Sequence, residues 1–459
     1  MADKARGRRR LSDADSLMWR IESDPVLRSP VLVVGLLDRA PKRPRLRRRL
    51  ELVTGEIHGL RQRIVPPRLG VGRAEWHDDP RFSVEHHLRW IRAPEGGIRG
   101  VLDFAEPDAM AAFDPERPPW SLTIVEGLGG GASAFVLRFH HSITDGVGGL
   151  LLADQLFDRT RRATAKRARS ADPVAVSTPR GSSRLLRSAG DAARAAADFA
   201  RQPIAAAGAS MSLGRSVVRL VAPAPPSEST LLAGRGLDRR LHVFELPVAS
   251  LREAATAVGA TVNDLLLAAV GGAFETYHRK LGAPVAAMTV TVPVDRRADA
   301  DPAGGNRFTP TRFVLPVDDP DVVTRAKIAG SFVRSWREEP ALGLTDLLAG
   351  GLNLLPAPIV TRFFGRLLRT IDADVTDLRG LDRPVFLAGA RIDRMWAFAP
   401  PTGAAFSVTL LSHGDTACVA VACDRAAVTD TNLLIDCLEA GFDEVVAVAH
   451  RGPTTEVES

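Results

Sequence analysis

The sequence predicts an α/β protein with mixed sheets, because segments typical of strands and of helices alternate along most of the chain. Short runs rich in β-branched residues, such as residues 31–37 (VLVVGLL) and 287–294 (AMTVTVPV), are typical of buried strands. Longer apolar runs, above all residues 262–277 (VNDLLLAAVGGAFETY), are typical of buried helices. The chain has 459 residues, 45% of them hydrophobic, which is enough for two or three domains with substantial cores.

Charge and cysteine content narrow the class of protein. Lysine and arginine exceed aspartate and glutamate by only six, and the excess is clustered. Three cysteines are too few for a disulfide framework, so we expect them to be core residues in a reducing compartment. The basic N-terminus is not followed by a long apolar run, and no apolar run reaches about 18 residues. We therefore expect a cytoplasmic protein without a signal peptide or membrane span, either soluble or bound to a surface.

The first half of the chain contains three strand-like runs. Residues 31–37 predict one strand, and the basic run 41–50 (PKRPRLRRRL) leads into a helix that ends near residue 63. This run is either a solvated helix face or a contact for phosphates. Residues 121–127 and 134–140 predict two more strands. The LGGGA between them predicts a hairpin turn, because it lacks the Lys and Ser/Thr of a phosphate-binding loop.

A change of composition separates this half from the next. Residues 159–230 are rich in Ala, Arg, Ser and Pro, which predicts a linker with an embedded helix. We expect a disordered basic tail over residues 1–10, an N-terminal domain over 11–158, that linker, a C-terminal domain over 231–450 and a tail over 451–459. The second half has predicted strands at 241–246, 287–294 and 313–317, predicted helices at 248–258, 262–277 and 433–448, an apolar helical region at 345–370 interrupted by prolines, and a hairpin formed by 405–411 and 418–423.

The segment FHHSITDGVGG, residues 139–149, contains the main candidate catalytic residues. Side chains alternate across a strand, so His140 and His141 point to opposite faces as long as the strand continues. Gly146, Gly148 and Gly149 then allow a sharp turn into a helix. A histidine at a strand end beside such a turn lies where α/β folds place functional groups.

Neutral histidine is a good general base near pH 7, and it could accept a proton from an alcohol that attacks an acyl carbon. Asp145 lies too close in sequence to reach the ring by a simple relay, so we expect it to hold the turn by pairing with a distant arginine. Two alternatives remain at this stage. One is a histidine pair that is part of the core, and the other is a metal site, against which the opposed strand faces argue.

His140-His141-xxx-Asp145-Gly146 resembles the HHxxxDG signature of CoA-dependent acyltransferases, which include chloramphenicol acetyltransferase, carnitine acyltransferases and peptide condensation domains. Further blocks, in the same order, resemble the bacterial wax ester synthase/diacylglycerol acyltransferase family. They are Pro118-Pro119-Trp120, Ile124-Val125-Glu126-Gly127-Leu128, Thr261-Val262-Asn263-Asp264, Pro293-Val294-Asp295-Arg296-Arg297, Gly305-Asn306-Arg307, Leu315-Pro316 and Leu387-Ala388-Gly389-Ala390.

The resemblance implies a fold of two chloramphenicol-acetyltransferase-like domains with an active-site tunnel between them. It implies that His141 is the catalytic base, that Asp145 is structural and that Arg297 pairs with it. It places Asn263 near the reaction centre, where its amide would polarise the thioester. The alternatives are a helix N-cap for Asn263 and a surface position for Arg297.

Two segments depart from the family pattern. Residues 376–381 (TDLRGL) keep only the glycine of an SNVPGP-like segment, and residues 412–415 read SHGD where the family tends to have Ser-Tyr-Asn/Asp-Gly. Both differences bear on substrate preference. Two other histidine positions are expected to be structural. His86-His87 resembles ordinary sheet-edge sequence, and His413 is expected to be a solvated turn residue.

The resulting hypothesis is an acyl-CoA-dependent O-acyltransferase that makes triacylglycerol from diacylglycerol, or wax esters from long-chain alcohols. Acyl-CoA is a co-substrate, and we expect no cofactor and no metal. The lipid acceptor implies peripheral association with the inner face of the membrane or with lipid droplets, and we expect no nucleic-acid partner. Two alternatives stay open. One is a condensation-type or small-alcohol acyltransferase, and the other is a non-catalytic lipid-binding paralogue.

Overall fold

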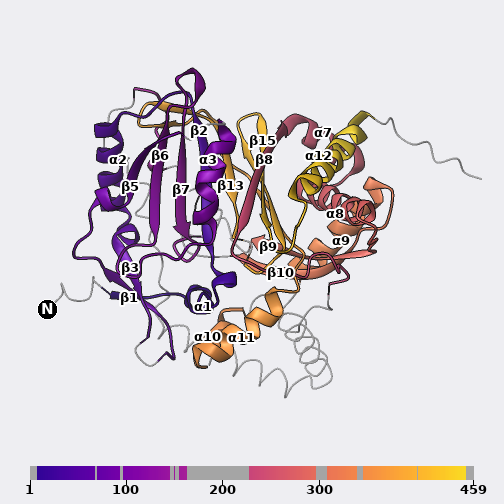
Figure 1. Cartoon of the computed structure of the whole chain (residues 1–459), viewed down its shortest axis with the longest axis horizontal. Coiled ribbons are helices and arrows are strands. Elements are labelled where there is room, and N and C mark those ends of the chain that lie inside the picture. Colours follow the sequence, from indigo (N-terminus) through magenta and orange to yellow (C-terminus); the bar gives the residue numbers. More distant parts are fainter. Residues whose placement is uncertain are drawn as a thin grey trace, which may run out of the picture.

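The computed structural model describes residues 8–67, 70–93, 97–144, 149, 155–162, 227–295, 308–338, 345–400 and 402–450. In these residues, two six-stranded sheets lie side by side, one built mainly from each half of the chain (Figure 1). Both sheets are mixed, since β5 runs parallel to β6 in the first and β11 runs parallel to its neighbours in the second. The predicted α/β class with mixed sheets is confirmed.

The first sheet has the spatial order β12 (Phe386–Leu387), β13 (Ala390–Phe398), β2 (Pro30–Leu37), β7 (Ser133–His140), β6 (Trp120–Glu126) and β5 (Leu88–Arg92). The predicted glycine-rich turn joins β6 and β7 as an antiparallel hairpin. Along β7, Phe135 and Phe139 pack into one apolar cluster, while Ala134 and Val136 pack into another on the opposite face. The expected alternation of this strand is confirmed. Helices α2 (Arg43–Glu56) and α3 (Ile98–Ala105) complete this half.

Helix α2 contains the basic run that the sequence marks as a possible phosphate contact. Leu46 and Leu50 are buried under the sheet. Four arginines of the run are ion-paired: Arg43 with Glu126, Arg45 and Arg49 with Asp158, and Arg47 with Glu51 and Glu85. Most of the charges of the run are therefore matched within the protein, while Lys42 and Arg48 are exposed and make no ion pair with a described residue.

A three-stranded sheet of β1 (Arg8–Arg10), β4 (Glu75–Asp78) and β3 (Gln62–Val65) borders the first half, next to α1 (Asp13–Ile21). The expectation that residues 8–10 belong to a disordered tail is wrong. Arg8 to Arg10 pair antiparallel with His77 to Glu75, so the backbone of β4 supplies their hydrogen bonds. Short 3-10 helices occur at Pro25–Leu27, His58–Arg61, Val84–His86, Glu106–Ala109, Gly129–Gly131 and Val448–His450.

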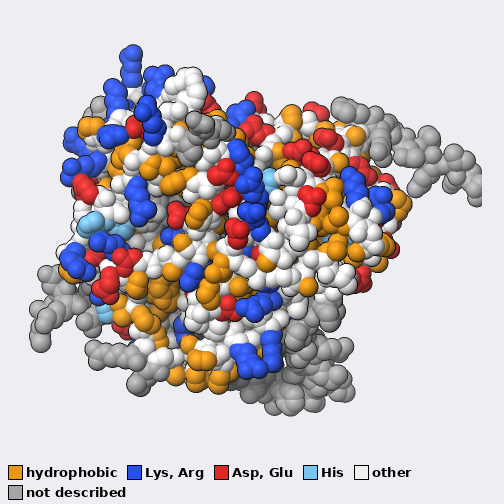
Figure 2. All heavy atoms as spheres, viewed as in Figure 1, with side chains coloured by type: hydrophobic (Ala, Val, Ile, Leu, Met, Phe, Trp, Pro, Cys, Tyr) orange, Lys and Arg blue, Asp and Glu red, His pale blue; other side chains and the backbone are white. Residues whose placement is uncertain are grey.

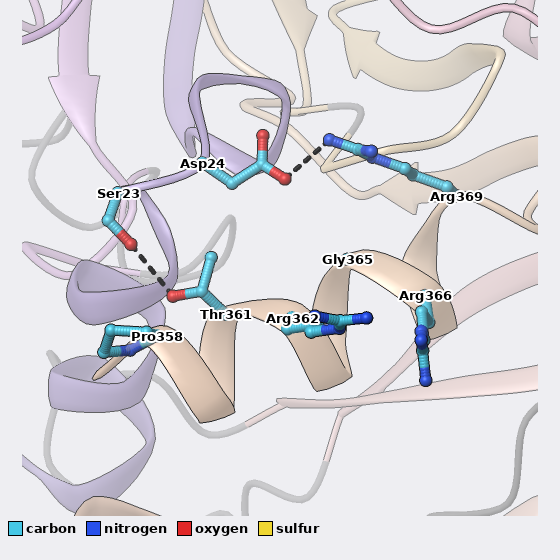
Figure 3. A pocket seen from close by; sticks show the side chains of 8 residues that line it. All are labelled: Ser23, Asp24, Pro358, Thr361, Arg362, Gly365, Arg366 and Arg369. Atoms are coloured by element: carbon cyan, nitrogen blue, oxygen red, sulfur yellow. Dashed lines mark hydrogen bonds and ion pairs between the residues drawn. The ribbon is translucent and has the colours of Figure 1, made fainter. Parts of the chain in front are cut away.

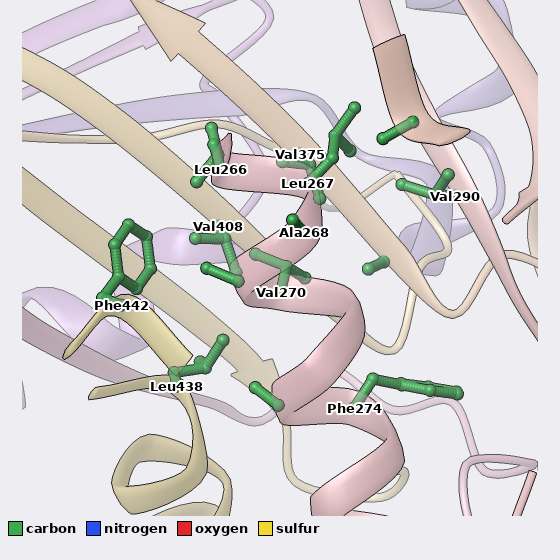
Figure 4. Packing of buried hydrophobic residues seen from close by; sticks show 14 of the residues in the cluster. Leu266, Leu267, Ala268, Val270, Phe274, Val290, Val375, Val408, Leu438 and Phe442 are labelled. Atoms are coloured by element: carbon green, nitrogen blue, oxygen red, sulfur yellow. The ribbon is translucent and has the colours of Figure 1, made fainter. Parts of the chain in front are cut away.

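The second sheet has the order β10 (Phe308–Pro316), β9 (Ala287–Asp295), β11 (Ala373–Leu378), β14 (Phe406–His413), β15 (Thr416–Asp424) and β8 (Arg239–Pro247). Helices α7 (Val248–Val258), α8 (Val262–Lys280), α9 (Val322–Arg337) and α12 (Thr431–Ala447) pack on one face of it. Figure 4 shows this core, in which Val270 and Phe274 of α8 belong to one apolar cluster with Val408 of the sheet and Leu438 of α12.

The predicted apolar region 345–370 forms two helices, α10 (Thr345–Asn353) and α11 (Ala357–Leu368). The break falls at Pro356, which is the N-cap of α11, because proline fits the start of a helix and not its interior. Both helices pack against α1 through an apolar cluster that includes Leu17, Ile21 and Val360.

Strands β12 and β13 lie within residues 231–450 of the chain, yet they extend the first sheet. β13 pairs antiparallel with β2, while β11 and β14, which flank it in sequence, belong to the second sheet. The tight turn between β12 and β13 consists of Ala388 and Gly389, both with positive φ angles of 48° and 95°. This geometry favours small residues, which accounts for the Leu-Ala-Gly-Ala block.

Most of the predicted linker, residues 163–226, lies outside the described residues. The three cysteines are buried and free, as expected, and burial raises the pKa of the Cys423 thiol to about 12. None of the described helices is by itself long and apolar enough to cross a bilayer; α7 and α8 meet that test only as a pair, across a 96° bend.

The second sheet has a polar strip on the face opposite its helices. Ala373 and Val375 of β11 pack into the helix-covered core, so Asp374 and Thr376 lie on the other face. The Thr376 hydroxyl donates a hydrogen bond of 3.2 Å to Asp374. Burial raises the pKa of the Asp374 carboxyl to about 7. The native state therefore binds this proton more tightly than the unfolded chain does.

Asp374→Asn should be more stable than the wild type, by a margin that depends on pH. An unfolded aspartate ionises with a pKa of about 3.9, whereas Asp374 in the native state ionises with a pKa of about 7. Between these two pH values only the unfolded wild type gains from ionisation, so its free energy of unfolding falls, while that of Asp374→Asn does not. Melting temperatures should show the difference widening from pH 5 to 7 and then staying constant. Asp318→Asn, at an exposed site, is the control. A difference for Asp374→Asn that does not change with pH would contradict the buried carboxyl.

Candidate active site

The two motif histidines lie where β7 ends. The backbone N–H of His140 donates to the carbonyl of Pro119 at 2.9 Å, and that of His141 donates to the carbonyl of Ser29 at 3.0 Å. The chain then turns, with the N–H of Ile143 bonded to the carbonyl of His140. His141 is therefore the first residue of a turn anchored to the chain segment that precedes β2.

The His140 ring is fully buried, and both of its nitrogens are engaged. Nε2 lies 2.7 Å from Oε1 of Glu22, and Nδ1 accepts the backbone N–H of Ser142 at 3.0 Å. Because Nδ1 is an acceptor, the proton of the neutral ring is on Nε2, where it is donated to the carboxylate. Trp19 and Phe113 pack edge-on against the ring.

Glu22 was not predicted from the sequence, yet it supports both histidines. It is the C-cap residue of α1. Its Oε1 accepts the His140 ring proton and also the backbone N–H of Ser29, at 2.5 Å. The carbonyl of Ser29 in turn holds the amide of His141. One carboxylate thus fixes the imidazole of His140 and the backbone of His141, and no local pattern links residues so far apart in sequence.

His141 is buried, with 9% of its surface exposed. Asp145, Gly146 and Arg297 lie outside the described residues, so their roles and the pairing of Asp145 with Arg297 stay predictions. Within the described part of the chain, no group of three or more His, Cys, Asp or Glu side chains is arranged to hold a metal ion.

Asn263 is the second residue of α8, and the alternative that it is the N-cap is wrong. Thr261 is the N-cap: its side chain accepts the N–H of Asp264, and the Asp264 carboxylate accepts the N–H of Thr261. This capping box explains why Thr and Asp flank the segment. The half-buried Asn263 side chain forms no hydrogen bond with the described residues, so its amide is available to a ligand.

The two segments that depart from the family pattern contact each other. The N–H of Gly380 donates to the hydroxyl of Ser412 at 3.0 Å, and the N–H of Gly414 donates to the carbonyl of Leu381 at 2.9 Å. A Cβ at position 380 would lie 1.9 Å from the Ser412 carbonyl oxygen, so only glycine fits. The two departures therefore form one contact region beside the second sheet.

The expectation that His413 is solvated is wrong, whereas the sheet-edge position expected for His86-His87 is confirmed. His413 is buried at the end of β14, and its Nε2 donates to the carbonyl of Ile392 on β13, 3.1 Å away, which links the two sheets. Burial lowers the pKa of the His413 imidazole. His87 directly precedes β5, the edge strand of the first sheet, and its carbonyl accepts the N–H of Leu122 on β6 at 2.7 Å, as expected for sheet-edge sequence. Its ring is buried, stacked between Phe82 and Trp120.

A pocket of about 500 Å³ lies between the end of α1 and α11 (Figure 3). Ser23 bonds to Thr361 across it at 2.9 Å, and Asp24 pairs with Arg369 at 2.6 Å. The expected tunnel between the two halves stays a prediction.

Comparison with known families agrees with this arrangement. Residues 11–266 match the wax ester synthase/diacylglycerol acyltransferase catalytic domain, and residues 304–445 match the C-terminal domain of the same family. A Mycobacterium tuberculosis H37Rv protein, provisionally named a diacylglycerol O-acyltransferase, is 34% identical over 98% of this chain and 94% of its own length. A second such protein, from M. tuberculosis CDC 1551, is 26% identical over 97% of this chain and 98% of its own.

Solved structures show the same fold. The wax ester synthase/diacylglycerol acyltransferase of Marinobacter aquaeolei VT8 superposes with a TM-score of 0.64 at 21% identity, covering 96% of this chain and all of the other. The first condensation domain of the CDA synthetase superposes with a TM-score of 0.65 at 20% identity, covering 98% of each chain. The chain therefore belongs to the wax ester synthase/diacylglycerol acyltransferase family and is an acyltransferase.

Proposed function

We propose that this enzyme transfers a long-chain acyl group from acyl-CoA to the hydroxyl of diacylglycerol, and also to long-chain alcohols, with His141 as general base. The observation that carries this proposal is the fixed state of His140. Its ring nitrogens are bound to Glu22 and to the Ser142 N–H. Of the two motif histidines, His140 is thus engaged in holding the turn, and we assign the proton transfer to His141.

The reaction proceeds by direct transfer. The acceptor hydroxyl attacks the thioester carbon while its proton passes to the His141 imidazole. The tetrahedral intermediate then collapses, the C–S bond breaks, and the imidazolium returns the proton to the departing CoA thiolate. No metal or prosthetic group takes part. In this proposal the amide of Asn263 donates a hydrogen bond to the developing oxyanion, and one such donor contributes roughly 2.7–4 kcal/mol.

A hydrophobic acceptor is dissolved in a membrane or lipid droplet, so the enzyme has to contact that lipid phase to bind it. We therefore include peripheral association with a membrane or lipid-droplet surface in the proposal. The similarity to the condensation-domain fold favours one alternative, an enzyme that accepts a carrier-bound thioester or a polar acceptor at the same histidine. The altered segments around Gly380 and Ser412 favour another, a protein that binds lipid without turnover.

Thiol release from palmitoyl-CoA distinguishes these functions. The purified protein should release CoA with diacylglycerol and with hexadecanol, and far less with water alone. Mass spectrometry should identify triacylglycerol and wax ester as the products. Release only from a carrier-bound thioester would favour the condensation-type alternative, and lipid binding without any release would favour the non-catalytic one.

His141→Ala should abolish thiol release while the protein still folds, as circular dichroism would show, because the substitution removes the proposed base and keeps the backbone bond to Ser29. His86→Ala is the matched control, since His86 is exposed and outside the motif. Normal turnover by His141→Ala would disprove the assignment of the base.

Glu22→Ala should lower kcat by about 10- to 100-fold with little change in KM for palmitoyl-CoA, because Glu22 positions the motif and does not bind the donor. Glu22→Gln should recover part of the loss, since its amide oxygen can still accept hydrogen bonds. The kcat–pH profile should shift in Glu22→Ala and not in the control Glu56→Ala, at an exposed site. An effect on KM alone would contradict a positioning role.

A further inference from the structure

Exposed apolar side chains are concentrated on one short stretch of the described residues. Seven large hydrophobic side chains are exposed, and four of them, Leu354, Leu355, Ile359 and Phe363, lie within ten residues around the start of α11. Leu354 is 70% exposed and Ile359 is 56% exposed. A contiguous group of this kind marks an interaction surface more often than scattered single residues do.

The exposed face of α11 also carries positive charge. Ile359, Arg362, Phe363 and Arg366 follow a spacing of three, four and seven residues, which places them on one side of the helix. The opposite side, with Val360, is buried against α1. Figure 2 shows apolar and basic side chains next to one another over α10 and α11.

These arginines differ from most of those in the basic run of α2, which are ion-paired. Arg362 and Arg366 are exposed and make no ion pair with any residue that the structure describes. In α2, by contrast, Arg45 and Arg49 are bound to Asp158. The unmatched positive charge next to an apolar surface is therefore found at α11.

Arginine side chains also line the pocket beside α11. Its lining includes Arg362, Arg366 and Arg369, with Asp24 as the single acidic residue. Asp24 is neutralised by Arg369 at 2.6 Å, which leaves two positive charges and the hydroxyls of Ser23 and Thr361 facing the space. A lipid phosphate is an anion that this set of donors can bind.

We propose that Leu354, Leu355 and the α11 stripe of Ile359, Arg362, Phe363 and Arg366 form a docking surface for a membrane or droplet monolayer that contains anionic phospholipids. The apolar side chains enter the acyl region while the arginines bind headgroup phosphates. This alternation of apolar and cationic residues along one helix face is typical of helices that lie in a lipid interface.

The docking surface is joined to the segment that holds the catalytic motif. Ser23 and Asp24, which bond to Thr361 and Arg369 of α11, directly follow Glu22, which holds His140. Binding at α11 would therefore bring the lipid phase to the part of the protein next to the motif. This inference rests on the proposed function in assuming that the acceptor is a membrane lipid.

Vesicle sedimentation tests the surface, with the full chain and with vesicles of phosphatidylcholine alone or mixed with phosphatidylglycerol. The wild type should bind the anionic vesicles more tightly, and less so at high salt. Arg362→Ala/Arg366→Ala should lower the partition coefficient about 30-fold, from about 1 kcal/mol for each basic residue. Ile359→Ser/Phe363→Ser should lower it about tenfold for each side chain. Arg252→Ala/Leu281→Ser, at exposed positions away from α11, should bind like the wild type.

Thiol release with detergent-dispersed diacylglycerol separates docking from catalysis, and both α11 variants should keep it. Equal binding of wild type and variants to anionic vesicles, or no preference for anionic lipid, would overturn the docking surface. A wild-type dimer that the variants convert to monomer, without vesicle binding, would overturn it in favour of a second copy. A protein that binds vesicles through α11 but releases no thiol supports the surface and contradicts the proposed reaction.

Discussion

The pairing of β13 with β2 determines how the two halves of this protein are joined. β13 enters the first sheet while its sequence neighbours β11 and β14 remain in the second. Its inward side chain Trp396 packs in one cluster with Val34 of β2 and with Cys418 and Ala420 of β15. The two sheets therefore share buried apolar surface, and the first sheet takes two of its six strands, β12 and β13, from the second half of the chain. The hydrogen bond from His413 to Ile392 adds a polar link at the same junction.

The motif at the end of β7 depends on this frame through β2. β2 lies between β13 and β7, and Ser29, just before β2, fixes the amide of His141. Glu22 then connects the histidine pair to α1, and α1 connects to α11. The core, the histidine pair and the exposed face of α11 are therefore linked in turn, through the Ser29 backbone, the Glu22 side chain and the apolar contacts of α1.

Sequence patterns were sufficient where the determining contacts are local. The glycine-rich hairpin before β7, the helices α7 and α8, and the hairpin of β14 and β15 each follow from spacing and turn residues within a few positions. Contacts across long separations were not predictable in this way. The bond between Glu22 and His140 spans 118 residues, and the burial of His413 depends on a strand from the other sheet. The predicted start of α8 at residue 262 is confirmed, but residue types alone left the N-cap open, since Thr261 and Asn263 are both residues that cap helices.

The contact between Gly380 and Ser412 has a consequence for how this family diverges. The other residues of both segments differ from the usual family pattern. The backbone of β14, however, approaches position 380 too closely for any side chain. Substitutions at the flanking positions are therefore compatible with this backbone contact, whereas any side chain at position 380 would force the two strand ends apart.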